Sequence, residues 1–446
     1  MSKSRPVAVI LILLSSGISI LAGILLDRGS GATTANYRAI YYGARCVINH
    51  SDPYRPADFL RVYERESGEF PSSPPKRKLF LRAVPICVNL PTTLFLIAPL
   101  ATLSWSISHV AWLALIASSF TTAAFLSNDL SKKYAPGLSL FFICFMLANS
   151  QVLFTVGNTA GIAVSLCVIA VWCFTQRKGI WIGTFLLAVS LALKPHDSGL
   201  LWAFLLVAGG ELRKRAIWTL LIVVVIAVPS IIWISTVAPQ WNQELKANLL
   251  ATSQRGDISD PGPSSISRQG SADVIISLQT VLSVLHDDQG FYDPISILIC
   301  AGILAIILFA TIRHRPGEPE IWFAIASIAA LSMLPSYHRP YDARLLLLAV
   351  PGASMLWKEG RKTIPIVTGA AVVLTSDIPL AILSLITRSI DLSGMDLFSR
   401  LAVLPLVRPV PLVLLTLTAF YGFAYIKTVR GRSPINMAPA HITVHS

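Results

Sequence analysis

Charged residues are scarce in this chain. Only 13% of its 446 residues are Asp, Glu, Lys or Arg, whereas 54% are hydrophobic, and the mean hydropathy is +0.65. A soluble globular protein carries about 25% charged residues. The composition therefore excludes a soluble globular protein, leaves no room for a large soluble catalytic domain, and predicts an integral membrane protein.

Cysteine pairs and clustered acidic residues are also lacking. The six cysteines show no C-x-x-C spacing and most lie in apolar runs, which excludes a disulfide framework and a cysteine metal site. No dense group of carboxylates demands a hard cation, so we expect that no metal or other cofactor is required. The formal net charge of +13 would suggest nucleic acid in a soluble chain. Here the basic residues cluster in short connections between apolar runs, as cytoplasmic loops do, so we expect membrane lipids as partners and no nucleic acid.

The apolar runs lack the alternating pattern of a membrane β-barrel. A backbone in lipid must satisfy its own hydrogen bonds, and a helix needs about 20 apolar residues to span. The sequence therefore predicts an all-α polytopic membrane protein with about 11–13 transmembrane helices. The first span is Val7 to Leu26, and the later ones are expected near 137–155, 159–176, 180–194, 199–210, 216–237, 291–312, 320–336, 344–357, 363–387 and 409–427.

Basic residues set the expected orientation. Lys3 and Arg5 place the N-terminus inside, and the later basic clusters also fall inside. We expect residues 1–446 to form one membrane-embedded domain in the inner (plasma) membrane, with a cytoplasmic tail at 428–446. Two long outer loops are predicted at 27–82 and 238–290. The two apolar stretches between Pro85 and Leu126 give the wrong parity if both cross, so one is broken or re-entrant.

The richest polar stretch is Tyr337-His338-Arg339-Pro340-Tyr341-Asp342-Ala343-Arg344, at the predicted outer mouth of an apolar helix. Arginine suits bidentate recognition of phosphate, and His and Asp hold or move protons. An ionisable group at membrane depth needs a partner, water or a function. An Asp342–Arg344 ion pair within a belt of interfacial aromatic residues explains the same pattern without chemistry.

Three further segments carry ionisable groups next to apolar runs. In 36–48, apolar and aromatic residues recur at helical spacing, which predicts an amphipathic helix on the outer membrane face; an interfacial anchor is the alternative. Lys194-Pro195-His196-Asp197 ends a predicted span, where a snorkelling lysine accounts for it equally well. Asp377, beside Ser376 and before Pro379, is either functional or the cap of a broken helix.

These segments, in this order, resemble the integral-membrane GT-C glycosyltransferases of family 87, which include polyprenyl-phosphate-sugar-dependent mannosyl- and arabinosyltransferases. The matching stretches are NYRAIYYGARCVINHSDPY, VNLPTTLFLIAPLATLSW, VGNTAGIAVSLCVIAVWC, LALKPHDSGLL and LPSYHRPYDARLLLLAVP. The resemblance implies a helical bundle whose first outer loop carries horizontal helices and a catalytic acid. It also implies a lipid-linked sugar phosphate as donor, a lipid or glycan acceptor at the outer face, and generally inverting transfer.

The resemblance also places individual residues, and the most serious departure from the family is at Asn36. Asn36 occupies the place of the expected catalytic aspartate, and an amide cannot accept a proton as a general base at neutral pH. The family's Tyr-Pro-Pro segment is Asn89-Leu90-Pro91 here, its Gly-Gln is Gly157-Asn158, and its Leu-Lys-Pro is Leu193-Lys194-Pro195.

Transfer from a glycosyl phosphate needs a base near the acceptor and cations around the leaving phosphate. We expect Arg339, Arg344 and Lys194 to bind the phosphate, with Arg45 or Arg38 contributing. Asp342 is the first candidate base and His338 the second, while Asn36 orients the acceptor. The remaining expected substrate-binding residues are His196, Tyr41, Tyr42, Asp52 and Tyr341.

Two other functions stay open. One is a chain that has lost transfer activity through Asn36 and only binds lipid. The other is a transporter or flippase of lipid-linked sugars, which also has intramembrane charges but usually shows inverted repeats. No such repeat is found in the sequence, and the long outer loops favour chemistry at the membrane surface.

Overall fold

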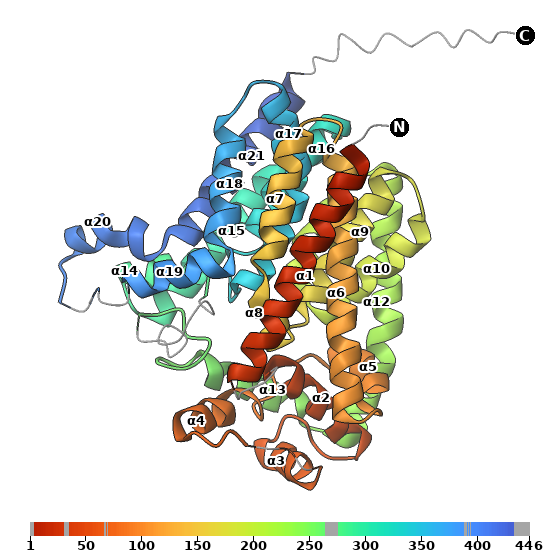
Figure 1. Cartoon of the computed structure of the whole chain (residues 1–446), viewed down its shortest axis with the longest axis vertical. Coiled ribbons are helices and arrows are strands. Elements are labelled where there is room, and N and C mark those ends of the chain that lie inside the picture. Colours follow the sequence, from red (N-terminus) through yellow and green to blue (C-terminus); the bar gives the residue numbers. More distant parts are fainter. Residues whose placement is uncertain are drawn as a thin grey trace, which may run out of the picture.

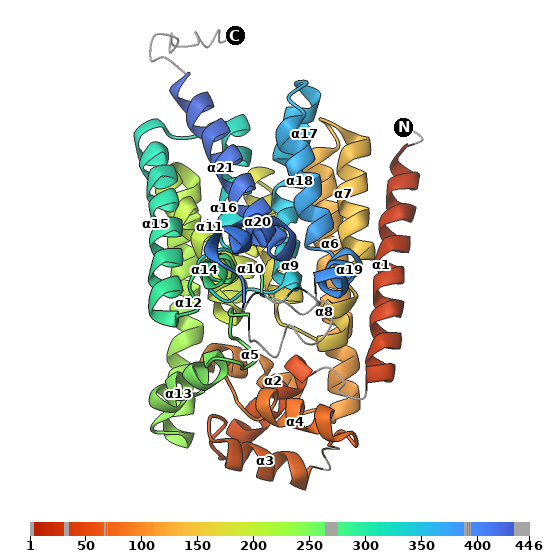
Figure 2. The same cartoon turned by 90° about the vertical axis from the view of Figure 1, so that its left-hand side faces the viewer.

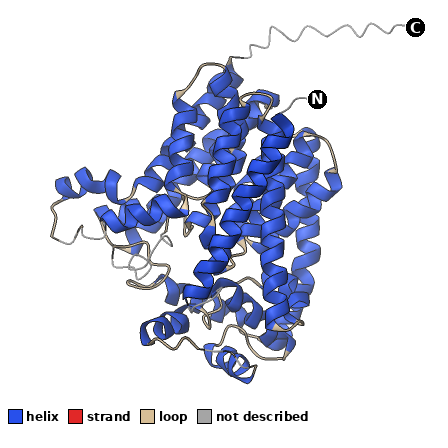
Figure 3. Cartoon of the chain, in the orientation of Figure 1, coloured by secondary structure: helices blue, strands red, loops and turns tan. Residues whose placement is uncertain are grey.

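The computed structural model describes residues 4–30, 35–66, 68, 70–263, 275–387, 390, 392 and 394–431. Within these residues the chain is helical and contains no strand (Figure 3). The predicted tail 428–446 lies outside them beyond Gly431, as do parts of both predicted outer loops. The all-α class predicted from the sequence is confirmed.

Long helices form a bundle that occupies the upper two thirds of the molecule in Figures 1 and 2. The first half of the bundle contains α1 (Ser4–Ser30), α6 (Trp105–Ser131), α7 (Pro136–Ala148), α8 (Gln151–Val156), α9 (Ala160–Thr175), α10 (Ile180–Leu193), α11 (Pro195–Ala208) and α12 (Gly210–Val237). The second half contains α15 (Gln289–His314), α16 (Glu318–Leu331), the 3₁₀ helix η2 (Pro340–Leu348), α17 (Val350–Lys358), α18 (Thr363–Leu374) and α21 (Pro409–Arg430).

Six of the described helical segments are long and apolar enough to cross a membrane, or seven if the bent pair α18 and α19 (Asp377–Thr387) is one span. This is fewer than the 11–13 expected from the sequence, because α9 and α10 have 16 and 14 residues. The expected span 344–357 is also different. It begins as buried η2 and continues as the nine-residue α17, whose start is set by Pro351, a residue with no N–H to continue the preceding turn.

One end of the bundle, here called the basic end, carries both ends of the described chain (Figure 1). Contacts there join connections that are distant in sequence. Lys133 after α6 donates to Glu318 at the start of α16 over 2.9 Å, and Lys358 at the end of α17 lies 5.9 Å from the ring centroid of Tyr134. The connections that the basic residues predict to be on one side of the membrane therefore do gather at one end.

The opposite end, here called the loop end, is formed by α2 (Ala35–Ile48), α3 (Pro56–Arg65), α4 (Pro74–Ala83) and α13 (Trp241–Ser253). The predicted amphipathic helix at 36–48 is thus present as α2. Its Tyr37 ring stacks on Trp112 of α6 with centroids 4.7 Å apart. The first outer loop is also held by α13, because the Asn248 side chain donates to Tyr54 O over 2.9 Å.

Two full crossings between residues 85 and 126 would place the later basic loops on the wrong side of the membrane, and the structure shows why only one is expected. Helix α5 (Pro91–Ala101) has 11 residues, too few to span, and both its ends lie at the loop end. Near its start, Thr93 Oγ1 donates to Leu193 O of α10 over 2.9 Å. Just after its end, Tyr41 of α2 donates to Leu103 O over 2.8 Å. Of the two apolar stretches, only α6 is therefore a candidate span.

Three helices project sideways from the bundle near the middle of its height in Figure 1: α14 (Gln279–Leu285), α19 and α20 (Leu397–Val407). α19 leaves α18 at a bend of 74°. α20 exposes Leu397 and Phe398, and Asp396 caps its first turn by accepting the Ser399 N–H over 3.0 Å. This exposed apolar surface is typical of helices that lie in a membrane interface.

Candidate functional site

Two helix breaks meet beneath the loop end, and each is set by a proline. A residue that precedes proline is disfavoured from helical geometry. Lys194 before Pro195 has φ −154° and ψ 80°, so α10 ends there and α11 begins at the proline. Arg339 before Pro340 is extended, with φ −121° and ψ 166°, and η2 begins at that proline.

The side chains at these two breaks form the Lys194 cluster, which consists of Lys194, Asp197, Asp342, His196 and His338. Lys194 Nζ donates to Asp342 Oδ1 and lies 3.4 Å from Asp197 Oδ2. The same ammonium lies 5.3 Å from the ring centroid of Tyr341. One buried lysine thus compensates two carboxylates that are each 1% exposed.

Asp342 has a second contact that fixes its position. Its Oδ2 accepts the Arg339 backbone N–H over 2.8 Å, at the N-terminus of η2. η2 lies outside every candidate span. Burial raises the pKa of the Asp342 carboxyl, against the opposing charge of Lys194. The result is a stronger base than an exposed aspartate, held by one charged and one backbone donor.

The two histidines of the cluster face Asp197 from different elements. His338 Nε2 lies 3.5 Å and His196 Nε2 lies 3.7 Å from Asp197 Oδ1. The two imidazole rings contact edge to face, with centroids 4.9 Å apart. His338 Nδ1 is 3.0 Å from Ser336 O. His338 is buried, whereas the His196 side chain is 41% exposed, so the cluster is accessible from the His196 side.

The second outer loop folds over this cluster. Ile276 donates its backbone N–H to His338 O over 2.9 Å, and Leu278 donates to Leu334 O over 2.9 Å. Arg339 Nη2 donates to Ile258 O over 2.9 Å, and its Nε donates to the Tyr337 hydroxyl. Residues on both sides of the undescribed stretch 264–274 therefore contact the segment that carries the cluster.

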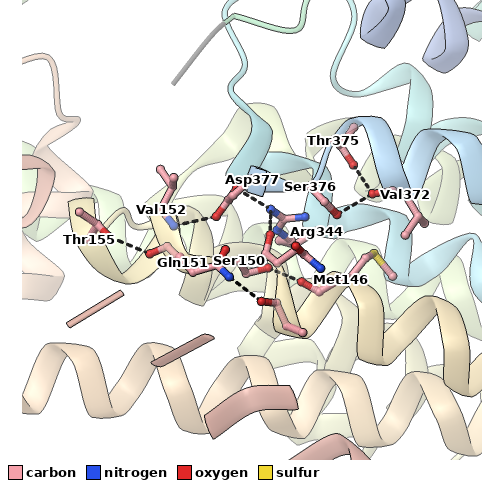
Figure 4. Close-up of polar contacts among 12 residues, drawn as sticks. Met146, Ser150, Gln151, Val152, Thr155, Arg344, Val372, Thr375, Ser376 and Asp377 are labelled. Atoms are coloured by element: carbon pink, nitrogen blue, oxygen red, sulfur yellow. Dashed lines mark hydrogen bonds and ion pairs between the residues drawn. The ribbon is translucent and has the colours of Figure 1, made fainter. Parts of the chain in front are cut away.

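The hydrogen-bond partners of Arg344 lie outside the Lys194 cluster. Its guanidinium pairs with Asp377 Oδ1 over 3.0 Å and donates to Asn149 O over 3.1 Å (Figure 4). Asp377 Oδ2 in turn accepts the N–H of Val152 over 2.7 Å. This ion pair joins the break between α7 and α8 to the break between α18 and α19. Asp377 thus caps a helix start, which is one of the two readings of its sequence position.

The expected binding residues on α2 make contacts inside the first outer loop. Arg38 donates to Tyr63 over 2.8 Å, and the Tyr42 ring meets the Tyr63 ring edge to face. Arg45 binds Glu66 through two nitrogens, with N–O distances between 2.6 and 2.9 Å. Together with the Tyr41 contact described above, these side chains hold the loop against α5 and α6.

Asp52, which follows α2 in the first outer loop, is held by contacts with the loop backbone and with α13. Its Oδ1 accepts the Tyr54 N–H over 2.8 Å, and Arg55 bridges it to Glu244 of α13, 3.7 Å from Asp52 and 2.6 Å from Glu244. Burial, reinforced by Glu244, raises the pKa of Asp52 to about 6.

Asn36 lies half-buried in the first turn of α2. Its side chain makes no hydrogen bond to another of the described residues. The sequence-predicted residues therefore form two groups at the same end of the bundle: the α2 side chains and the Lys194 cluster. α5 connects them, because it packs on α2 and bonds through Thr92 and Thr93 to the last carbonyls of α10.

Sequence reasoning omitted Asp197 from the candidate residues, although it stands in the quoted Lys194 motif. Its position three residues after Lys194, in the first turn of a helix that starts at proline, is the signal that could have identified it. Glu66 and Glu244 were also missed. Their partners are 21 and 189 residues away in sequence, so no local pattern could reveal them.

Comparison with known families gives one match. The family model of glycosyltransferase family 87 matches residues 89–336, more than half of the chain. No curated protein and no solved structure matches this chain. The matched region includes Lys194 and Asp197 and ends just before Tyr337, so Asn36 and Asp342 lie outside it.

Proposed function

The chain belongs to glycosyltransferase family 87, and we propose that it moves a hexosyl or pentosyl group from a polyprenyl-phosphate donor to a lipid or glycan hydroxyl. We place this reaction at the outer face of the inner (plasma) membrane, with the N-terminus in the cytoplasm. The observation that carries the proposal is the buried Lys194 cluster, which residues of the second outer loop cover. Buried ionisable groups are costly and cluster mainly at functional sites.

The leaving group sets the need for cations. When the acceptor attacks the anomeric carbon, negative charge develops on the donor phosphate, and fixed positive charges in a dry site stabilise it strongly. We assign this role to Lys194 and Arg339, which belong to the two adjoining helix breaks. Two cations neutralise a phosphate monoester, so this scheme needs no cofactor. Arg38 and Arg45 stay secondary candidates, because they lie on α2, outside the two helix breaks, and Glu66 offsets the charge of Arg45.

Arg344 has a different role in this proposal. Its guanidinium is buried and shared between Asp377 and Asn149 O. We therefore treat Arg344 as a positioning residue that holds η2, and with it Asp342, against α8 and α19.

The base is assigned to Asp342, with His338 as the alternative. A base must lose or share its existing donors when the acceptor hydroxyl arrives. Lys194 moving from Asp342 to the donor phosphate would free the carboxylate at that moment. Asn36 orients the acceptor, since an amide donates and accepts hydrogen bonds but takes no proton at neutral pH.

A transfer assay tests the proposal. Purified protein in liposomes receives radiolabelled polyprenyl-phosphate sugar and a membrane-lipid extract as acceptor. Label in a new lipid product supports the transferase. Label that crosses the bilayer unchanged identifies a flippase. If the label is neither transferred nor transported, the chain only binds lipid.

Variants locate the chemistry within this assay. Lys194→Met should lower transfer by at least about a hundredfold, the scale of removing one charge-stabilising group. The matched control is Lys178→Met, an exposed lysine at the basic end, which should transfer normally. The Asn36→Asp variant tests the alternative that this chain has lost transfer activity through Asn36. If wild type shows no transfer and Asn36→Asp restores it, this chain is an inactive family member.

A further inference from the structure

We propose that His196, Asp197 and His338 form a binding site for a divalent transition-metal ion of the Zn²⁺ type. One ligand atom from each residue lies within 4.8 Å of the other two. Asp197 Oδ1 is 3.5 Å from His338 Nε2 and 3.7 Å from His196 Nε2. A tetrahedral ion with bonds of about 2.0–2.1 Å sets its ligand atoms about 3.3 Å apart, so small side-chain movements complete the site.

The orientation of His338 supports this assignment. Its Nδ1 faces Ser336 O at 3.0 Å, and a carbonyl only accepts, so Nδ1 carries the proton. In the neutral ring, Nε2 then presents a lone pair, and it presents it to a carboxylate oxygen. Two acceptors facing each other repel unless a cation lies between them. A backbone carbonyl on the far nitrogen is also how proteins orient metal-binding histidines.

Buried atoms without hydrogen-bond partners give an independent observation. His338 Nε2 and both carboxylate oxygens of Asp197 are buried without a hydrogen-bond partner in the described residues. Both side chains are 1% exposed. Buried polar atoms are normally satisfied, and those that are not point to an unseen water or ion. Two of these atoms, His338 Nε2 and Asp197 Oδ1, face each other at 3.5 Å, whereas Asp197 Oδ2 faces Lys194.

Charge favours a cation over a water molecule. The cluster contains two carboxylates, Asp197 and Asp342, and one lysine, so with neutral histidines its net charge is −1. The nearby Arg339 directs its guanidinium to Tyr337 and Ile258 O. Lys194 approaches Oδ2 of Asp197, which leaves Oδ1 for the two histidines. A divalent ion at Oδ1 therefore offsets a buried negative charge without displacing the lysine.

The donor set indicates the class of metal. Two imidazoles and one carboxylate suit Zn²⁺ and similar ions, whereas Mg²⁺ and Ca²⁺ prefer oxygen ligands. Three protein ligands leave a fourth position open, as in catalytic rather than structural zinc sites. The half-exposed His196 gives the ion a route in. Binding does not depend on the proposed transferase reaction, but an ion on His338 Nε2 would leave Asp342 as the base.

Metal binding is measured directly on the full chain. Protein purified in detergent through a tag without histidine is stripped with a chelator and titrated with Zn²⁺ and Co²⁺. Metal content by mass spectrometry should approach one ion per chain. Bound Co²⁺ should show the intense visible bands of a tetrahedral site.

Variants identify the ligands. His196→Gln and His338→Gln should each weaken binding at least about tenfold. His196→Gln is the decisive variant of the two. Its side chain is partly exposed, so the replacement should leave the fold intact. His286→Gln changes an exposed histidine just after α14; it is the matched control and should bind as wild type does. A chain with His441 and His445 replaced by Gln removes the remaining candidates near the C-terminus.

Two results would overturn the proposal. Wild type could bind less than about 0.2 ion per chain after titration, or His196→Gln and His338→Gln could bind as tightly as wild type. Neither readout uses sugar transfer. A chain that binds metal without transferring sugar would contradict only the proposed function, and a chain that transfers sugar without binding metal would contradict only the metal site.

Discussion

The buried Arg344–Asp377 pair allows a prediction with a magnitude. Replacing Asp377 by Ala leaves a guanidinium that is 1% exposed without its counter-charge, which costs about 3–5 kcal/mol. The Val152 N–H also loses its acceptor, at about 1–3 kcal/mol for a buried donor. We expect Asp377→Ala to lower the free energy of unfolding by about 4–8 kcal/mol, against a typical total of about 5–15 kcal/mol.

The double variant Arg344→Met with Asp377→Leu should be far less damaging. Hydrophobic residues that replace both partners of a buried ion pair are often neutral or stabilising. Only the Val152 N–H then stays unsatisfied, so we expect a loss of about 1–3 kcal/mol. The double variant should therefore be more stable than Asp377→Ala alone.

Unfolding by denaturing detergent, followed by tryptophan fluorescence, measures these free energies. An unfolding free energy of Asp377→Ala within about 1 kcal/mol of wild type would contradict this prediction, because it is below the smallest cost of an unpaired buried charge. A second contrary result would be that the losses of Arg344→Met and Asp377→Leu, each measured alone, simply add in the double variant, since coupled groups do not add. The same proteins test the role of Arg344. A folded double variant that transfers sugar supports positioning, whereas a folded but inactive one makes Arg344 a direct ligand of the phosphate.

Three further predictions concern the loop end and its supports. Burial raises the pKa of Asp52 to about 6, above its unfolded value, so its charged form destabilises the fold. Stability should rise as pH falls from about 6 to about 4, and Asp52→Asn should flatten that part of a melting-temperature profile. A Cβ on Gly23 would meet Phe154 Cβ at 2.6 Å, so Gly23→Val should lower the unfolding free energy by about 1–3 kcal/mol, measured by detergent denaturation. Trp112→Phe removes the 2.9 Å bond to Gly157 O and should cost about 1–2 kcal/mol in the same assay; an unchanged value would contradict the importance of this contact.

Local sequence signals determined much of the candidate site. Lys194-Pro195 and Arg339-Pro340 each end one element and begin another, because proline restricts the residue before it. The charged residues beside these prolines were therefore expected at helix ends. What the chain order could not show is that the two breaks, 145 positions apart, bring Lys194 onto Asp342 and Asp197 onto His338.

Arg344 illustrates the opposite outcome. By sequence it belongs with Arg339 as a phosphate ligand, since both stand within one eight-residue motif. The 3₁₀ geometry of η2 turns its side chain toward Asp377. A 3₁₀ helix has three residues per turn rather than 3.6, so residues two or five apart point in directions that the α-helical period does not predict.

Composition and the spacing of basic residues were sufficient for the membrane class and for which connections share an end, because lipid admits few backbone structures and charge distribution sets orientation. They could not give the short α5, the broken helices or the partners of Asp377. Those depend on which distant backbone groups a buried side chain can satisfy, and only the packed tertiary structure decides that.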